Sequence, residues 1–277
     1  MKLSLGELMD FNLIDTHAHL NFPDYKKDLD QVIKRSLENV VGKIICVSSN
    51  LADSFKAIEI AKKYPHIIYA AVGIHPHQTD PENKDSLKEQ IKKLKTLVKK
   101  EKVVAIGECG LDFSQADPEL EKNRTSKDQE DLFRWQIEMA LEFNLPVLVH
   151  SRKAFPQVMT LLREYFQSSD GHLRGIFHCY SAGKKEIKQV EEIGFFFGLD
   201  GNLTYDLGLQ NVAKEIPLEK IVLETDCPFL SPEPYRGLRN ETGNVKINAE
   251  FLSKLKSISL DKVAQETTQN AQKLFKI

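Results

Sequence analysis

The sequence has no long hydrophobic run. No apolar segment approaches the roughly 18 consecutive residues that indicate a membrane-spanning helix. The first residues, Met1 to Phe11, also lack a basic segment followed by a long apolar core, which is the pattern of a secretion signal. We therefore expect a cytoplasmic protein that does not interact with a membrane.

The chain also has few cysteines and no excess of charge of one sign. Its four cysteines form no CxxC pair, so a secreted disulfide framework is not expected and a reduced compartment fits better. With 38 basic and 40 acidic residues the formal net charge is -2, so no global positive field is available to hold a nucleic acid. Any polyanionic substrate would need a local basic rim.

What the chain does have is a regular alternation of segments. Short apolar runs rich in β-branched residues alternate with longer charged amphipathic stretches, which is typical of repeated βα units and a parallel sheet. Eight runs are expected to be strands: Leu13–His17, Lys43–Ser48, Ile67–Val72, Val103–Glu108, Pro146–His150, Gly175–His178, Phe195–Leu199 and Ile221–Asp226. They predict an α/β protein with a (β/α)8 TIM-barrel fold, formed by a single domain over residues 1–277.

The stretches between these runs carry apolar residues at three-to-four spacing and are expected to be the outer helices. They are Leu29–Val40, Ala52–Tyr64, Ser86–Lys100, Lys127–Phe143, Ala154–Phe166 and Lys184–Ile193. The lysine-rich stretch Lys92–Lys102 resembles a nucleic-acid patch, but Leu94, Leu97 and Val98 interrupt it at helical spacing. We interpret it as the solvated face of a helix.

The candidate functional residues lie at the ends of the apolar runs. His17 and His19 are two residues apart, so in a strand both side chains project from the same face. The residues that end later runs are Glu108, His150, His178 and Asp226. A single histidine after a strand is more often structural than a ligand, but the carboxyl ends of all barrel strands meet at the active-site face. Six such residues at one end therefore predict a metal site.

Four histidines and two carboxylates are more ligands than one tetrahedral zinc ion uses, so we expect two divalent ions that share a carboxylate. In our interpretation His17, His19 and Asp226 bind one ion, His150 and His178 bind the other, and Glu108 bridges them. The candidate catalytic residues are Glu108, as the bridge between the ions, and Asp226. An aspartate beside the attacking water can accept its proton. Imidazoles favour zinc, manganese or iron, whereas Mg²⁺ prefers oxygen ligands, so we expect tight binding of a transition metal such as Mn²⁺ or Zn²⁺.

Seven short motifs, in order along nearly the whole chain, resemble the TatD-related metal-dependent deoxyribonucleases. They are Asp15-Thr16-His17-Ala18-His19-Leu20, Gly73-Ile74-His75-Pro76-His77, Ile106-Gly107-Glu108-Cys109-Gly110-Leu111-Asp112, His150-Ser151-Arg152, Phe177-His178-Cys179-Tyr180-Ser181, Leu223-Glu224-Thr225-Asp226-Cys227-Pro228 and Pro234-Tyr235-Arg236-Gly237. The resemblance implies a barrel whose metals are held by the six residues named above, with phosphodiester hydrolysis as the usual activity. Because the family usually depends on magnesium, the expected ions are Mg²⁺, Mn²⁺ or Zn²⁺, with activity in the presence of Mg²⁺ or Mn²⁺. Where the family usually continues Arg-Asn-Glu with proline, this chain has Thr242, which concerns the shape of one rim loop and not the metal site.

The favoured function is therefore hydrolysis of DNA phosphodiester bonds, by a 3′–5′ exodeoxyribonuclease acting on single strands or short oligonucleotides. An open metal-containing mouth suits a strand end better than a duplex interior, while the polarity and the preference for DNA come from the resemblance alone. Two alternatives stay open. One is ester or amide hydrolysis on the same metals, as in D-aminoacyl-tRNA deacylation, and the other is an inactive barrel that serves as a scaffold. The scaffold alternative predicts missing ligands, and none is missing from the sequence. No obligate protein partner is expected.

Substrate-binding residues are expected on the loops after the strands. Guanidinium groups suit phosphate oxygens, and the candidates are His75, Arg152, Tyr235, Arg236 and Arg239. Surface ion pairing is the alternative for the arginines, and a structural role is the alternative for His75. Candidates for stacking on bases, or for packing loops against the barrel, are Phe22, Phe113 and Tyr180. The polar loop Asp112–Ser126 either covers the site and contacts the substrate or is an ordinary exposed excursion.

Neighbours of the candidate ligands have expected supporting roles. Strand parity turns Asp15 and Glu224 toward the interior, where they can orient a histidine or balance a buried cation. The same parity turns Cys109, Cys179 and Cys227 away from the metals, so we expect these cysteines to pack as small apolar residues.

Overall fold

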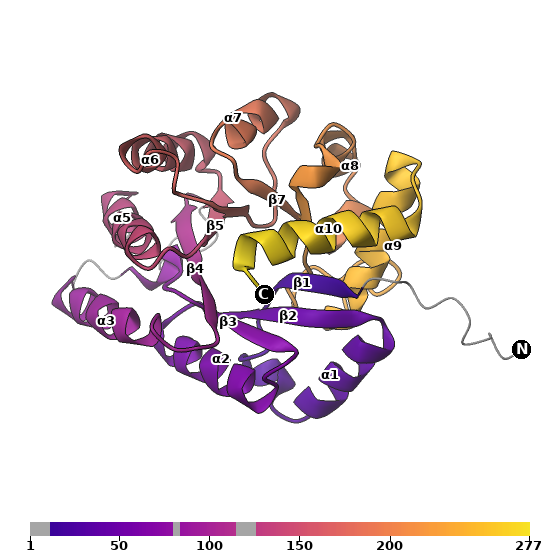
Figure 1. Cartoon of the computed structure of the whole chain (residues 1–277), viewed down its shortest axis with the longest axis horizontal. Helices are drawn as coiled ribbons and strands as arrows, with labels where there is room; N and C mark the ends of the chain where they lie inside the picture. The colour runs from indigo at the N-terminus through magenta and orange to yellow at the C-terminus, as the bar shows by residue number, and fades with distance from the viewer. Residues whose placement is uncertain (1–11, 80–83, 115–125) are drawn as a thin grey trace, which may run out of the picture.

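The computed structural model describes residues 12–79, 84–114 and 126–277 of the chain. Its centre is a sheet of eight parallel strands in sequential order. The strands are β1 (Leu13–Ala18), β2 (Val41–Val47), β3 (Ile68–Val72), β4 (Val103–Asp112), β5 (Val147–Arg152), β6 (Gly175–Phe177), β7 (Phe196–Leu199) and β8 (Ile221–Leu223). A parallel bridge between Ala18 and Cys227 brings the start and the end of the sheet together in a nearly closed ring (Figure 1). The predicted (β/α)8 barrel is confirmed.

Helices surround this ring and cover its outer face (Figure 1). They are α1 (Leu29–Glu38), α2 (Leu51–Lys63), α3 (Lys84–Leu97), α5 (Ser126–Glu142), α6 (Phe155–Ser168), α7 (Ile187–Glu192), α8 (Leu207–Ala213), α9 (Val245–Lys256) and α10 (Leu260–Phe275). The six predicted helices correspond to α1, α2, α3, α5, α6 and α7, with a 3-10 turn preceding α7. The sequence analysis did not predict the last three.

The start of several helices is fixed by side chains that precede them. Asn50 accepts a hydrogen bond from the backbone N–H of Asp53 at 2.9 Å, which satisfies a free donor in the first turn of α2. Ser259 accepts one from the N–H of Lys262 at 3.2 Å and begins α10 in the same way. The lysine-rich region of α3 buries Leu94, Leu97 and the following Val98, as its helical spacing predicts.

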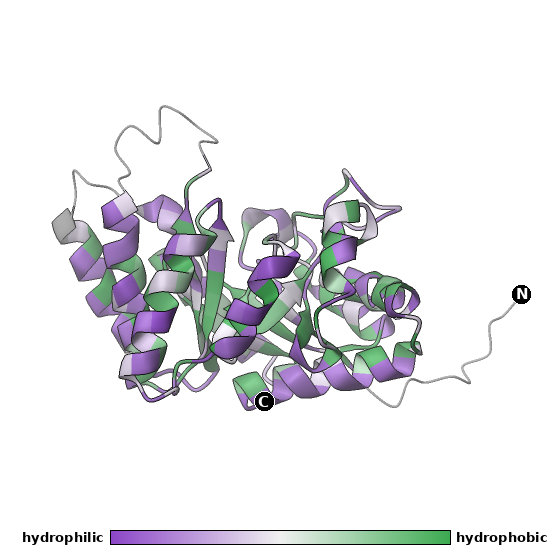
Figure 2. Cartoon of the chain, turned by 90° about the horizontal axis from the view of Figure 1, so that it is seen from above, coloured by the Kyte–Doolittle hydropathy of each residue, from purple (hydrophilic) through white to green (hydrophobic). Residues whose placement is uncertain are grey.

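The interior of the barrel is apolar and is closed at one end by α10. Side chains such as Val104 and Leu148 project from the strands into this interior. Ala271, Leu274 and Phe275 of α10 pack against them and complete the cluster. In Figure 1, α10 lies across the ring, and Figure 2 shows it opposite the loops that follow the strands, with green apolar strands inside largely purple helices. The other end is therefore the one left for chemistry.

Of the helices in the described ranges, none combines the length and the apolar character that crossing a membrane requires.

Candidate metal centre

The first two candidate ligands come from β1 and the residue after it. His17 is fully buried and His19 is 3% exposed. Nδ1 of His19 donates to the carbonyl oxygen of Val47 at 3.1 Å, which leaves Nε2 free to face the centre. Both ring nitrogens of His17 are buried with no hydrogen-bond partner in the described part of the chain. Buried polar atoms of this kind call for a ligand such as a cation.

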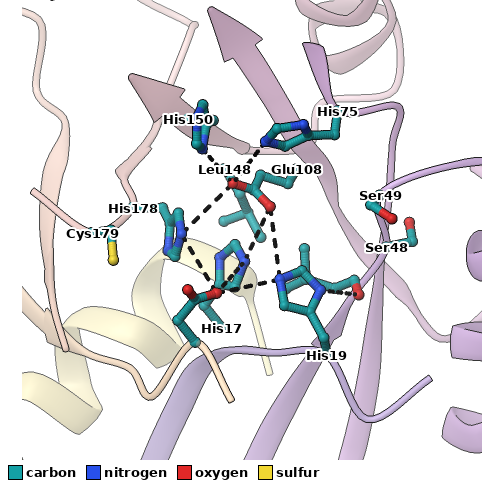
Figure 3. Close-up of polar contacts among 12 residues, drawn as sticks. His17, His19, Ser48, Ser49, His75, Glu108, Leu148, His150, His178 and Cys179 are labelled. Atoms are coloured by element: carbon teal, nitrogen blue, oxygen red, sulfur yellow. Dashed lines mark hydrogen bonds and ion pairs between the residues drawn. The ribbon is translucent and has the colours of Figure 1, made fainter. Parts of the chain in front are cut away.

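Glu108 lies at the middle of the cluster, between two sets of histidines (Figure 3). Its Oε2 is 3.6 Å from Nε2 of His17 and 3.8 Å from Nε2 of His19. Its Oε1 is 2.8 Å from Nδ1 of His150 and 3.7 Å from Nε2 of His75. Each oxygen of the carboxylate therefore faces a different set of imidazoles.

The second carboxylate, Asp226, lies just beyond the end of β8 on the side of His17. Its Oδ1 is 3.3 Å from Nε2 of His19, 3.8 Å from Nε2 of His17 and 3.7 Å from Nε2 of His178. The predicted strand ran to Asp226, but β8 ends at Leu223. Asp226 has a φ of 54°, and its N–H donates to the carbonyl oxygen of His17 at 2.8 Å. That turn directs its side chain into the centre.

Close approach of β4 and β5 brings Glu108 and His150 together. Gly110 has a φ of 143°, and a Cβ there would overlap the carbonyl oxygen of His150. β4 continues past Glu108 to Asp112, whose Oδ2 is 2.9 Å from Nε2 of His150. The same oxygen is 3.0 Å from Nε2 of His77. Asp112 therefore orients His150. The sequence analysis missed this role, although residues 108, 110 and 112 of one strand point to the same side and so place Asp112 beside Glu108.

Glu224 orients His178 in a similar way. Its Oε1 is 3.0 Å from Nδ1 of His178 and accepts a hydrogen bond of 2.6 Å from the N–H of Cys179. The ring of His178 stacks on that of His17 with centroids 3.5 Å apart. Glu224 thus lies beside a candidate ligand, as strand parity predicted. Asp15 instead accepts hydrogen bonds from Thr225, whose hydroxyl lies 2.6 Å from it, and from the backbone of His17.

The electrostatics of the cluster match this geometry. Burial raises the pKa of Glu108, but His75, His150, His17 and His178 outweigh it and hold that pKa well below its usual value. Burial lowers the pKa of His150, but its bonds to Asp112 and Glu108 raise it to about 9. For His178, Glu224 and the other carboxylates overcome burial and raise the pKa to about 10. The carboxylate of Glu108 is thus held ionised, with His150 and His178 as cationic neighbours, whereas burial lowers the pKa values of His17 and His75. A divalent ion would replace the positive charge of the two protonated rings.

The residues present fit such ions. Two sets of ligand atoms lie within 4.8 Å of one another around Glu108: one contains His17 and His19, and the other contains His75 and His150. A third set joins His17 to His178 and Asp226. The structure thus brings together all six residues that the sequence analysis selected. The structure also adds His75 to this cluster. His75 lies three residues beyond the end of β3, and the sequence analysis assigned it to substrate binding.

The predicted substrate arginines differ from one another. Arg239 is 2.6 Å from Oδ2 of Asp28 and 2.9 Å from Oε1 of Glu241, and it lies over the ring of Tyr25. These contacts agree with the ion-pairing alternative for Arg239. Arg236 lies over the ring of Tyr205, 4.1 Å from its centroid.

Tyr235 and Arg152 are exposed, with Tyr235 45% exposed on the loop after β8. The loop Asp112–Ser126 lies outside the described residues over 115–125.

Of the three predicted stacking residues, Phe22 lies nearest the metal centre. Its ring stacks on His19 with centroids 4.6 Å apart, and Phe229 lies edge-on to it at 6.1 Å. Phe229 is 52% exposed and was not predicted. Tyr180 is buried edge-on against Phe197, so its ring packs the loop against the barrel. Phe113 is half-buried against the core.

Two further expectations concern the rim loop and the cysteines. Thr242 is buried, and its hydroxyl hydrogen-bonds the hydroxyl of Ser36, so Thr242 anchors the rim loop to α1. Cys109 and Cys227 are free and fully buried, as expected. Cys179 differs, because its thiol donates a hydrogen bond to the carboxylate of Asp200.

Comparison with known proteins identifies the family. The model of the "TatD related DNase" family matches residues 14–276. The chain is a member of the TatD-related DNase family. It is 38% identical to the "uncharacterized metal-dependent hydrolase YabD" of Bacillus subtilis, over 96% of this chain and 99% of that protein. It is 34% identical to human "deoxyribonuclease TATDN3", over 95% and 94% of the two chains.

Solved TatD structures agree with this membership. The Escherichia coli TatD homologue YJJV superposes with a TM-score of 0.84 at 28% identity, over 96% of this chain and 98% of that one. A TatD family hydrolase from Entamoeba histolytica superposes with a TM-score of 0.83, also at 28% identity, over 97% and 99% of the chains. The TatD resemblance seen in the sequence is therefore confirmed, and the chain is a metal-dependent hydrolase of that family.

Proposed function

We propose that this TatD-family hydrolase cleaves phosphodiester bonds of DNA with two divalent ions, as a 3′–5′ exonuclease on single strands or short oligonucleotides. The observation that carries the proposal is the division of imidazoles between the two oxygens of Glu108. Oε2 faces His17 and His19, and Oε1 faces His150 and His75. A carboxylate shared in this way would suit two divalent ions.

The residues divide into two binding sets. His17, His19 and Asp226 would hold one ion, and His150 and His75 would hold the other. The sequence analysis placed His178 with His150, but its Nε2 is 3.7 Å from both Oε1 of Glu108 and Oδ1 of Asp226, so it lies between the two sets. Bound there, Mg²⁺, Mn²⁺ or Zn²⁺ would neutralise phosphate charge and lower the pKa of an attacking water. Asp112 and Glu224 keep the rings of His150 and His178 in position.

Asp226 is the residue we propose as proton acceptor. Burial raises its pKa, but contact with His19 and His178 lowers it below the ordinary value. The carboxylate is therefore ionised at neutral pH and can take a proton from water without a large movement.

Nucleic acid as the substrate is supported by the surroundings of the centre and by the relatives. The family is named for DNase activity, and the human relative is named a deoxyribonuclease. Phe22 and the exposed Phe229 lie beside His19, where rings can stack on bases of any sequence. Tyr235 and Arg236, on the loop after β8, add an exposed aromatic ring and a cation to the same rim.

The test follows a 5′-labelled single-stranded DNA over time, with metal-stripped protein to which Mg²⁺ or Mn²⁺ is returned. We expect a ladder that shortens from the 3′ end, and its loss in Glu108→Gln, which keeps the shape of the side chain and removes its charge. Glu38→Gln is the matched control, because Glu38 is exposed at the end of α1. An uncleaved oligonucleotide with two ions bound per chain would overturn the proposal, and D-aminoacyl-tRNA would be the next substrate assayed.

A further inference from the structure

A pocket opens beside the metal centre, between the loops that follow β5 and β6. Its volume is about 560 Å³, and His178 lies among its lining residues. The remaining walls include Ser151, Arg152, Lys153 and Ser181. A volume of this size lies within the range that holds small ligands and is larger than a phosphate group alone needs.

The charged side chains among the described lining residues of this pocket are all basic. None of its described lining residues is acidic, while Arg152 and Lys153 are both exposed cations. Neither cation makes an ion pair with another described residue, in contrast to Arg239 with its two carboxylates. Cations that make no ion pair are suited to an anionic ligand.

Two further features point to an anion that also accepts hydrogen bonds. The hydroxyl oxygen of Ser151 is buried and has no partner within the described ranges. Helix α6 begins at this pocket with Phe155 and Pro156, and its N-cap, Ala154, offers no side-chain acceptor to the first turn. The positive end of the helix dipole thus adds to the field of the two cations.

A second cavity of the rim lacks this character. It has a volume of about 650 Å³ and lies between the loop after β1 and helices α1 and α2. Its lysines are accompanied by Asp30 and Glu59, and Lys63 is paired with Asp30 at 2.7 Å. Of these two cavities, the pocket beside His178 is therefore the one suited to an anion.

We propose that this pocket binds the nucleotide next to the scissile bond by its phosphate group, so that the enzyme favours substrates with a second phosphate. The inference rests on the proposed phosphodiester hydrolysis. Arg152 and Lys153 would hold the second phosphate, with Ser151 and the start of α6 as additional donors. Because Arg152 and Lys153 would contact the second phosphate and not the scissile bond, they act on substrate binding.

The test compares three thymidine dinucleotides: TpT, pTpT with a 5′ phosphate and TpTp with a 3′ phosphate. We expect one of the phosphorylated forms to have a KM about tenfold below that of TpT, which corresponds to about 1.4 kcal/mol. In the double variant Arg152→Gln/Lys153→Gln that ratio should fall to about one, with the change in KM and not in kcat. Arg163→Gln, on the outer face of α6 and paired with Glu192, is the matched control and should keep the wild-type ratio.

A binding measurement separates this inference from the proposed function. Calorimetry with thymidine 3′,5′-bisphosphate and metal-stripped protein should give a dissociation constant about tenfold weaker in the double variant than in the wild type or Arg163→Gln. Hydrolysis of all three dinucleotides with equal KM, and equal bisphosphate binding by all proteins, would overturn the pocket alone. No hydrolysis by the wild type, together with bisphosphate binding that depends on Arg152 and Lys153, would overturn the reaction and support the anion pocket.

Discussion

The two ends of the barrel have opposite chemistry. At the amino end Leu274 and Phe275 of α10 pack on apolar strand residues such as Val104. At the carboxyl end buried imidazoles surround Glu108, which is itself only 4% exposed. Burying ionisable groups costs free energy unless they are paired, whereas burying apolar surface stabilises the fold. The apolar packing at the amino end thus offsets the free-energy cost of burying the candidate metal ligands at the carboxyl end.

The largest effect expected at the carboxyl end is that of Glu108→Ala. Both sets of imidazoles lose the carboxylate between them, so we expect loss of bound metal and a fall in kcat of at least ~10³-fold, or about 4 kcal/mol. Metal content per chain and single-strand cleavage measure this. Two ions retained per chain with near-normal cleavage would contradict the bridging role.

At the amino end we expect Leu274→Ala to act on stability alone. The side chain is 2% exposed, and its removal leaves a cavity under the barrel interior that lowers the free energy of unfolding by ~2–4 kcal/mol. Urea denaturation of the metal-stripped protein gives this number. The metal content of the folded variant should equal that of the wild type, and a parallel loss of metal would show that the two ends are coupled.

A pH series tests the electrostatics of the carboxyl end. The pKa values of His150 and His178 are raised to about 9 and about 10, so both rings are protonated at neutral pH without metal. Metal binding must release these two protons. The affinity for a divalent metal ion should therefore rise by up to ~100-fold per pH unit near pH 7, or about 2.7 kcal/mol. Without metal, the stabilisation from the two shifts is fully present below pH ~6.5 and is lost as the pH rises through 9 to 10.

Calorimetry in buffers of different ionisation enthalpy counts the released protons. We expect about two per chain at pH 7.5 and a decline toward zero above pH 10. A count near zero at pH 7.5 would show that the histidines are already neutral.

A smaller effect is expected from Asp112→Asn. The change removes the charge that orients His150 and keeps the shape of the side chain, so Mn²⁺ affinity should fall ~10–100-fold, or about 1.4–2.7 kcal/mol. Asp131→Asn on the exposed side of α5 is the matched control. Equal Mn²⁺ titration curves for the two variants would exclude a role for Asp112.

The smallest effect is expected from Arg239→Gln. Its ion pairs with Asp28 and Glu241 are partly exposed, so the free energy of unfolding should fall by only about 0.5–1 kcal/mol, with little change in the KM for DNA. A KM increase as large as that of the Arg152/Lys153 variant would instead place Arg239 on the substrate.

Prediction from the sequence was most accurate where a local pattern carries the information. The apolar runs located each of the strands within a few residues, because a buried parallel strand must be apolar over its whole length. Strand ends were less accurate: β4 continues four residues beyond Glu108, and β8 stops three residues before Asp226. Helix α10 was missed because much of its buried face consists of small or polar residues, such as Ala264, Thr267 and Ala271.

The sequence alone determined the barrel and the six residues that gather at its carboxyl end, because hydrophobic periodicity and strand parity are local properties of the chain. Which arginine is free and which is paired was decided only by the tertiary structure. Arg239 meets Asp28, which is 211 positions away in the sequence, while Arg152 meets no carboxylate among the described residues. The same holds for His75 beside Glu108 and for Asp112 beside His150, since contacts between separate βα units exist only after the barrel has closed.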